Sequence, residues 1–260
     1  MSASIDLVEV LFSLFWLFFI GLILYLHRES KREGYPLDSD RTDRSGGRVQ
    51  VQGFPSVPDT KHFLTAHGET VAVPRAELSD AADDSLAVKP AARYPGAPMV
   101  PTGNPMHDGV GPAAYSNRAN VPDKTLHNEN RIVPMRVATD FVVMDKDPDP
   151  RGMEVLGADN KVAGTVADVW VDRAEPLVTF FEVDLGSANG GKHVLLPIGF
   201  SKIDGNKRQI KVRSIYASQF ADVPAIASPD EITLREEDRI MGYFGGGTLY
   251  ADAARQEPLI

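Results

Sequence analysis

The 260-residue sequence contains no cysteine, which excludes thiolate catalysis, cysteine-bound zinc, iron–sulfur clusters and disulfides together. It is also poor in positive charge: the net charge is −9, which argues against nucleic acid as a partner because neutralising phosphates requires a basic surface. The six histidines show no HxxxH-type spacing, and the glycine triplet at 245–247 follows a predicted helix instead of opening one. Neither a metal site, a phosphate loop nor a nucleophile–base pair is therefore predicted, and an enzyme is disfavoured.

Long apolar runs are scarce, with a single exception at Val10–Leu26, where thirteen of seventeen residues are Val, Leu, Ile or Phe. As a helix this run covers roughly 25 Å, and Leu7 and Val8 extend it towards the roughly 30 Å of a bilayer core. A signal peptide would begin with basic residues, whereas Asp6 and Glu9 precede this run. A buried core helix would show a polar face, whereas aromatic residues surround this one. The run predicts one membrane-spanning helix.

Basic residues follow this span, and no Lys or Arg precedes it. The positive-inside rule then predicts an outside (periplasmic) N-terminus and a cytoplasmic C-terminal part. Five residues are expected to contact lipid as a membrane collar: Trp16, Tyr25, Arg28, Lys31 and Arg32.

Three regions are expected: an anchor at 1–36, an irregular extended segment at 37–130, and a β domain at 131–260. Residues 38–52 are polar and read as a solvated linker or a docking surface, whereas 61–73 could supply one or two edge strands. Residues 74–120 are rich in Pro, Ala, Gly and Asp and are either disordered or laid on a partner's surface, with specified turns at 101–106 and 109–112.

The last region has alternating apolar and polar residues typical of antiparallel strands. Strands are predicted at 153–156, 161–172, 177–185, 193–198 and 209–212, with 193–198 as a central strand. The fold class is thus one transmembrane helix plus a mainly-β domain, a small antiparallel barrel of five or six strands, with one C-terminal helix. This closing helix is predicted at about 229–244, with Ser228 as N-cap, a capping-box Glu231 and an end at Gly245–Gly247.

An acidic cluster lies around one strand turn: Asp168, Asp172, Glu175 and Glu182. It has two interpretations. It is either the solvated face of the barrel, or a proton relay in which neighbouring carboxylates raise one another's pKa values.

Several motifs resemble a known family, and they match nearly the whole chain in order. They are R-E-G-Y-P-L at 32–37, P-T-G-N-P-M at 101–106, D-G-V-G-P-A-A at 108–114, V-P-M-R-V-A at 133–138, D-P-R-G-M at 149–153, V-A-G-T-V-A-D-V-W-V-D at 162–172 and R-E-E-D-R-I-M-G-Y at 235–243. Together with the anchor they resemble the H subunit of the purple-bacterial photosynthetic reaction centre. The resemblance implies a PRC-type barrel on the cytoplasmic side of the bacterial inner (chromatophore) membrane, capping the L and M subunits.

The resemblance also implies a non-catalytic subunit that supports the secondary-quinone and iron region and carries protons to the reduced quinone. The chain itself would bind no redox cofactor as a principal ligand. The parent complex carries bacteriochlorophyll, bacteriopheophytin, quinones and non-haem iron. A cytochrome subunit, a light-harvesting antenna ring and membrane lipids are further expected partners.

Residue by residue, the proton-path Glu of the family falls on Glu175 and its neighbouring Asp on Asp172, with Asp168 earlier on the same strand. The first member of a surface His pair falls on His127, the second position holds Glu129, and an Asp before the pair is Thr125 here. An Arg near the path is replaced by Thr179, and Asp123 or Glu129 could substitute at the proton entrance. The rival hypothesis is a membrane-tethered β-barrel adaptor or assembly protein without a proton role.

Overall fold

The computed structural model describes residues 7–35, 37–42, 44, 48–65, 68–74, 86–94 and 96–256. The chain forms two compact units, 1–85 and 86–260. Residues 86–130 thus group with the β domain, and the observed division lies well before the expected boundary at 130/131.

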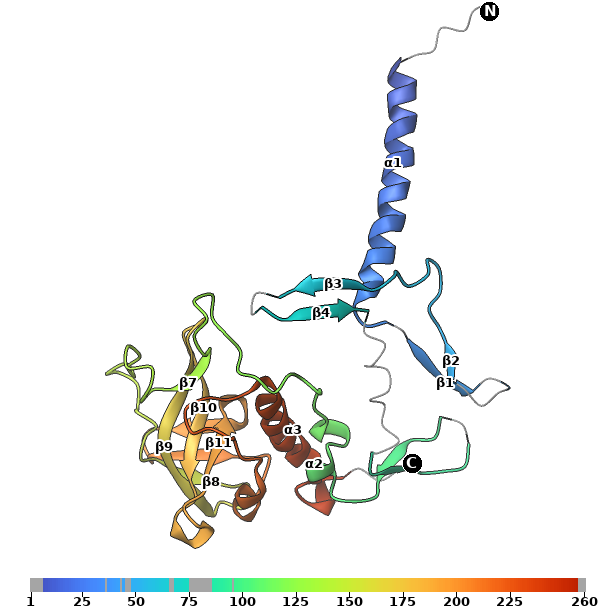
Figure 1. Cartoon of the computed structure of the whole chain (residues 1–260). Helices are drawn as coiled ribbons and strands as arrows, with labels where there is room; N and C mark the ends of the chain where they lie inside the picture. Colours follow the sequence, from blue (N-terminus) through green and yellow to red (C-terminus); the bar gives the residue numbers. More distant parts are fainter. Residues whose placement is uncertain are drawn as a thin grey trace, which may run out of the picture. The chain divides into compact units, whose positions relative to one another are not determined.

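The first unit begins with helix α1, Leu7–Glu29, continued by a 3₁₀ turn at Ser30–Arg32 (Figure 1). No residue of α1 is buried within the protein. Leu7–Arg32 is, within the part of the chain that the structure describes, the one helix long and apolar enough to span a membrane. The predicted span is therefore confirmed as a helix, and Gly34, with φ of +75°, follows its end.

Two hairpins complete this unit. The first pairs β1, Asp38–Thr42, with β2, Arg48–Gln50, and the second pairs β3, Lys61–Leu64, with β4, Thr70–Val73. The prediction of edge strands at 61–73 is confirmed. Residues 38–52, interpreted from their polarity as a linker or docking surface, contain the first hairpin; their alternation is confined to 48–52 and is too short to predict it.

The second unit contains a sheet of seven strands. They are β7 (Ile132–Pro134), β8 (Glu154–Leu156), β9 (Val162–Asp172), β10 (Leu177–Asp184), β11 (His193–Pro197), β12 (Ser201–Asp204) and β13 (Gln209–Val212). Their order is β11-β10-β9-β8-β13-β12, with β7 also paired to β9. All neighbouring strands are antiparallel except β8 and β13, which are parallel. The expectation of a purely antiparallel barrel is therefore wrong for this one pair. The predicted central position of 193–198 is wrong, since β11 ends the strand order; α3 packs against it, so its residues are apolar without being central.

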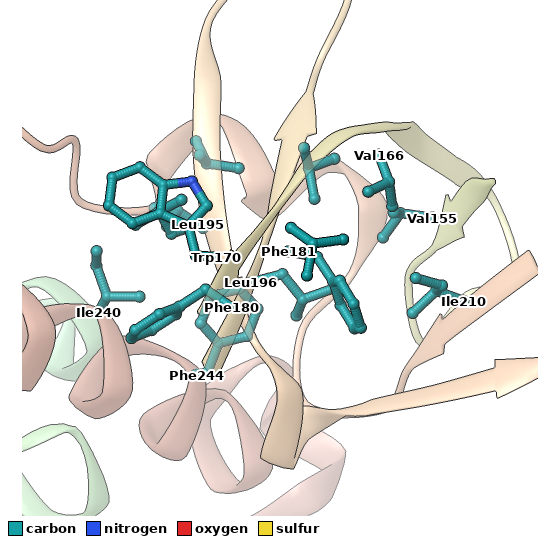
Figure 2. Packing of buried hydrophobic residues seen from close by; sticks show 14 of the residues in the cluster. Val155, Val166, Trp170, Phe180, Phe181, Leu195, Leu196, Ile210, Ile240 and Phe244 are labelled. Carbon is teal, nitrogen blue, oxygen red and sulfur yellow. The ribbon is translucent and has the colours of Figure 1, made fainter. Parts of the chain in front are cut away.

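Both faces of the long pair β9–β10 are buried. Figure 2 shows Trp170 and Phe180 on the side of Ile240 and Phe244, while Phe181 lies with Val155 and Ile210 on the other side. Each of these side chains is 2% exposed or less, and burying one such side chain stabilises the fold by about 1.5–3 kcal/mol. The face that carries Asp168, Trp170 and Asp172 is therefore not a solvated face.

Helix α3, Leu234–Tyr250, starts five residues later than predicted and continues through the glycine triplet. Its N-cap is Thr233, whose Oγ1 accepts from the N–H of Glu236 at 3.2 Å while the Glu236 carboxylate accepts from the N–H of Thr233 at 2.9 Å. A second capping box, five residues beyond the predicted one at Ser228, thus begins the helix. A Cβ on Gly247 would lie 2.3 Å from Ile215 Cγ2, so the glycines serve close packing and do not end the helix.

The segment before the sheet is more ordered than its composition suggested. It contains the hairpin β5 (Val88–Pro90) and β6 (Met99–Pro101) and the short helix α2 (Pro105–Asp108), capped by Asn104 and ended by Gly109 with φ of +68°. The predicted turns are confirmed. Helix α2 and the 3₁₀ turn at Gly111–Ala113 pack on α3, so this stretch lies on the protein's own helix.

Candidate functional site

The guanidinium of Arg131 contacts three of the acidic residues predicted from the sequence, Asp123, Asp172 and Glu175. Its Nε donates to Asp172 Oδ2 at 2.8 Å, and its terminal nitrogens lie 3.3 Å from Asp123 and 3.2 Å from Glu175. Arg131 precedes β7, whose first residue pairs with Asp172 at the end of β9, and the Arg131 N–H donates to the Asp123 carbonyl at 2.9 Å. These four residues, the Arg131 cluster, are therefore fixed by the sheet and by the loop before it.

Asp172 is the rigid member of the Arg131 cluster. Its side chain is 6% exposed, and its Oδ1 accepts from the backbone N–H groups of Ala174 at 2.8 Å and Glu175 at 3.1 Å. Burial raises the pKa of Asp172, but the hydrogen bonds from Arg131 and from these N–H groups outweigh burial and hold the pKa below its ordinary value. Asp172 is thus an ionised acceptor at neutral pH.

Glu175 is the movable member. Its backbone is held by Asp172, whereas its side chain is 70% exposed and contacts Arg131 at 3.2 Å. An ion pair this exposed contributes little stability, so the carboxylate can leave Arg131 and return at small cost.

The predicted entrance residues lie on the exposed loop before Arg131. Thr125 Oγ1 accepts from the backbone N–H groups of His127 and Glu129, both at 3.3 Å, so it holds the turn where the family carries an Asp. Glu129 lies 3.7 Å from Arg173, the neighbour of Asp172, and the His127 side chain is exposed. The structure thus brings Glu129 to the edge of the Arg131 cluster and leaves His127 on the surface.

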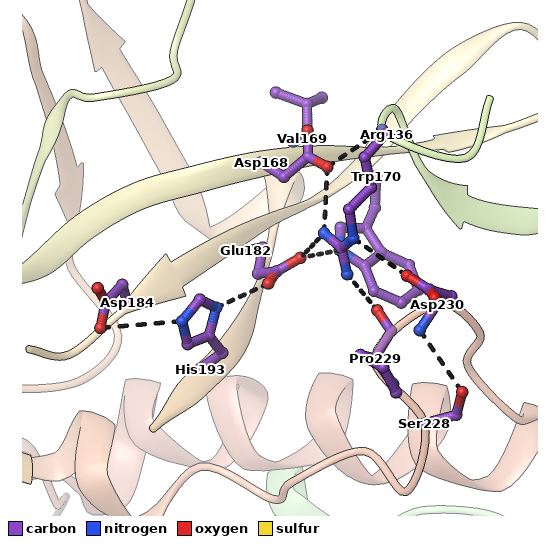
Figure 3. Close-up of polar contacts among 10 residues, drawn as sticks. All are labelled: Arg136, Asp168, Val169, Trp170, Glu182, Asp184, His193, Ser228, Pro229 and Asp230. Carbon is purple, nitrogen blue, oxygen red and sulfur yellow. Dashed lines mark hydrogen bonds and ion pairs between the residues drawn. The ribbon is translucent and has the colours of Figure 1, made fainter. Parts of the chain in front are cut away.

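Asp168 belongs to a second cluster around Arg136 (Figure 3). The Arg136 guanidinium binds Glu182 at 2.6 Å, Asp168 at 3.1 Å and Asp230 at 3.0 Å, and it also donates to the Pro229 carbonyl. Ser228–Asp230, predicted as a helix start, is instead the loop that receives this arginine. We call Arg136, Asp168, Glu182 and Asp230 the Arg136 cluster.

Glu182 is the most enclosed carboxylate of the Arg136 cluster. It accepts from Trp170 Nε1 at 3.0 Å and lies 2.7 Å from His193 Nδ1. Burial raises the pKa of Glu182, but the hydrogen bonds from Arg136, Trp170 and His193 outweigh burial and lower it. Glu182, together with Arg136, Asp168 and His193, lines a surface cavity of about 930 Å³.

The expectation that the four acidic residues raise one another's pKa values is therefore wrong. Arginines divide them into two clusters, and the pKa values of Asp172 and Glu182 are both lowered. The sequence analysis missed Arg131 and Arg136, although they flank β7. The β7–β9 register pairs Pro134 with Trp170, and two residues further it places Arg136 opposite Asp168, so the strand pairing would have revealed them.

A third missed residue is Glu237 on α3. Burial raises the pKa of its carboxyl group, and the negative charges of Asp238 and Asp123 raise it further. The positive charge of Arg118 lowers this pKa in part. Because Asp123 is among its charged neighbours, Glu237 is electrostatically linked to the Arg131 cluster.

The predicted membrane collar is only partly exposed. Lys31 is 3% exposed, with Nζ donating to the carbonyls of Gln52 at 2.5 Å and Pro55 at 2.6 Å, and Arg32 is buried against Glu29 and the Asp59 carbonyl. The expectation that Lys31 and Arg32 contact lipid headgroups is therefore wrong, because both side chains are hydrogen-bonded to groups within the first unit. Arg28 and Tyr25 are exposed near the helix end, and Trp16 is exposed close to its middle.

Comparison with known proteins identifies two families along the chain. The family model described as "Photosynthetic reaction centre, H-chain N-terminal region" matches residues 1–137, and the model described as "PRC-barrel domain" matches residues 143–219. An uncharacterized protein of Deinococcus radiodurans is 30% identical over 94 residues, which cover 33% of this chain and 34% of that protein. The chain thus spans about a third of that relative, whereas the H-chain match covers more than half of the chain itself. The chain therefore belongs to the photosynthetic reaction centre H-chain family.

Proposed function

We propose that this protein is the single-span H subunit that caps the L and M subunits of a photosynthetic reaction centre and passes protons to the reduced secondary quinone. Membership of the family makes it a reaction centre subunit, associated with L and M. The pigments, quinones and non-haem iron belong to the complex, and this chain contributes structure and titratable groups. A cytochrome subunit and an antenna ring would be further neighbours.

The observation that carries the proton role is the convergence of Asp123, Asp172 and Glu175 on Arg131. A relay needs a group that carries the proton and a fixed charge that holds this carrier in position. Glu175 has the exposure of a carrier, whereas Asp172, whose pKa is lowered, stays ionised and holds Arg131 and the backbone of Glu175 in place. Arg131 contacts both, so it keeps the local charge balanced when a proton arrives.

The residues that would deliver protons from solvent lie next to Asp172 and Glu175. His127 and Glu129 are exposed on the loop before Arg131, and Glu129 reaches the cluster through Arg173. Glu237, whose pKa is raised by burial and by the charges of Asp238 and Asp123, is a further titratable group near the Arg131 cluster. In this arrangement Glu129 takes the position of the missing second histidine.

The orientation follows from charge. Arg28, Lys31 and Arg32 lie after the span, and no Lys or Arg precedes it, which favours a periplasmic N-terminus and a cytoplasmic barrel in the bacterial inner membrane.

The decisive experiment is flash-induced uptake of the second proton by the purified complex carrying Glu175→Gln. This change keeps the shape and removes the titratable group, and we expect uptake slowed by about tenfold or more, equivalent to about 1.4 kcal/mol of barrier. Glu154→Gln, another exposed carboxylate of the same barrel, is the matched control and should leave the rate unchanged.

An unchanged rate in Glu175→Gln would refute the relay and leave the chain as a membrane-tethered adaptor. The ion pairs of Arg131 would then serve only to hold the loop before β7 on the sheet.

A further inference from the structure

The first unit contains three exposed apolar side chains with no role in the proposed relay: Phe54 in the loop between β2 and β3, and Phe63 and Leu64 in β3. We call these three residues the apolar rim. They are 82%, 48% and 75% exposed. We propose that the apolar rim is an interfacial lipid anchor, which lies in the headgroup layer and inserts into the glycerol and acyl boundary of phospholipids. The inference rests on the membrane span of the proposed function.

Phe54 is fixed close to the helix end by the buried ammonium of Lys31. Lys31 lies two residues after the last residue of α1, and its Nζ binds the carbonyls of Gln52 and Pro55, on either side of Phe54. The Tyr35 ring lies 5.3 Å from the same ammonium. The loop is therefore held by the protein interior while the Phe54 ring points away from it.

The strand with the other two rim residues is tied to the same helix turn. Lys61, the first residue of β3, lies 3.1 Å from Glu29, the last residue of α1. Arg32 binds the same Glu29 at 2.6 Å and the Asp59 carbonyl at 2.5 Å. Phe63 and Leu64 thus begin two residues from a fixed point on the helix.

The depth of that fixed point follows from helix geometry. The uncharged run ends at Leu26, so Glu29 lies about 4.5 Å further along the axis at 1.5 Å per residue. Each headgroup layer is roughly 5–8 Å thick, the difference between the whole bilayer and its hydrocarbon core shared by two sides. The ion pair of Glu29 with Lys61 therefore falls within the headgroup layer, and the apolar rim falls beside it.

Composition favours lipid over a protein partner at this level. The exposed cations Arg28 and Lys61 accompany the rim, and aromatic or aliphatic side chains mixed with basic ones are typical of membrane interfaces. These cations also offset locally the acidic charge of the chain, which would otherwise repel anionic headgroups.

The test uses the absence of cysteine from this chain. Phe54→Cys and Leu64→Cys are labelled with a nitroxide in the intact complex, in vesicles of phosphatidylcholine and phosphatidylglycerol. Collision rates with oxygen and with a water-soluble nickel chelate then report depth. The unmutated complex, labelled in parallel, corrects for cysteines of the partner subunits, and Leu126→Cys, on a fully exposed side chain, gives the aqueous reference.

We expect oxygen to be favoured over nickel at positions 54 and 64 relative to position 126. Labels as accessible to nickel as at position 126 would place the rim in water, and labels shielded from both reagents would place it under a protein partner. Either result overturns the proposal. Leu17→Cys, in the middle of α1, tests the span separately, because its failure to favour oxygen would refute the membrane helix itself.

Discussion

Replacing Arg136 with Met tests whether the Arg136 cluster holds the β domain together. The substitution keeps most of the aliphatic stem and removes the cation shared by Asp168, Glu182 and the loop at 229–230. The side chains of Asp168 and Glu182 are only 11% and 9% exposed, so both carboxylates would remain buried without their arginine.

The expected loss is about 3 kcal/mol. Removing one partner of a buried ion pair costs about 3–5 kcal/mol, and the lower end applies because Arg136 is itself 38% exposed. That is a large part of the 5–15 kcal/mol by which a typical domain is stable.

The pH dependence should reverse as well. In the parent protein the pKa of Glu182 is lowered, so its contribution to stability is full above the unfolded pKa of about 4.3 and is lost as pH falls through the folded pKa. Without Arg136, burial dominates and the pKa of Glu182 rises above its unfolded value. The variant should then become less destabilised as pH falls from 7 towards 5.

The assay is hydrogen exchange of β9 and β10 amides in the purified complex at several pH values, corrected for intrinsic exchange. About 3 kcal/mol corresponds to exchange faster by roughly a hundredfold. Arg151→Met removes an arginine from an exposed pair with Asp149 and should cost less than about 1 kcal/mol. If both variants behave alike, or if Arg136→Met shows no pH reversal, the structural role assigned to this cluster is refuted.

Three further predictions address other parts of the fold. Glu237→Gln should stabilise the domain relative to the parent as pH rises above the unfolded carboxyl pKa of about 4.3, because the raised pKa means that folding favours the protonated carboxyl; parallel pH profiles of thermal unfolding for variant and parent would contradict this. Gly247→Ala should destabilise α3 by up to about 2 kcal/mol, since overpacking costs about 1–3 kcal/mol against about 1 kcal/mol of helix propensity gained, whereas Gly199→Ala has open space and should be neutral in the same hydrogen-exchange assay. Lys31→Met leaves two carbonyls without their ammonium and should make the loop at 52–55 sensitive to proteolysis, whereas Arg28→Met, on an exposed cation, should not.

Local patterns were sufficient for elements whose signal lies within a few residues. The apolar run gave α1, the alternation in 162–172 gave β9, and the residues Asn104 and Gly109 gave the turns around α2. Each of these depends on side-chain periodicity or on one backbone preference.

The start and end of α3 were mispredicted because two local signals compete. Ser228 and Thr233 each open a capping-box pattern, and only the loop's use by Arg136 favours the second. A glycine triplet equally suits a helix end and a close helix contact, and the contact with Ile215 decides for the latter. Both decisions come from residues far away in the sequence.

The two arginine clusters lay beyond local patterns for the same reason. Arg131 and Asp172 are 41 residues apart, and Arg136 and Glu182 are 46 apart. Spacing along the chain grouped the acidic residues with one another, whereas strand pairing grouped each of them with an arginine that flanks β7.

The contrast between the clusters is the strongest reason to place proton movement at Arg131. In the Arg136 cluster the side chains of Asp168 and Glu182 are nearly buried and both bind Arg136, so a proton arriving from the adjoining surface cavity would have to displace a buried ion pair. At Arg131 the buried carboxylate is accompanied by Glu175, which is 70% exposed and reaches the same guanidinium. The Arg136 cluster suits a structural role and the Arg131 cluster suits proton transfer, although both are built from an arginine flanking β7 and an aspartate on β9. The difference lies in the partner carboxylate, on a turn at Glu175 and within a strand at Glu182, which is why Glu175→Gln should affect proton uptake and Arg136→Met should affect stability.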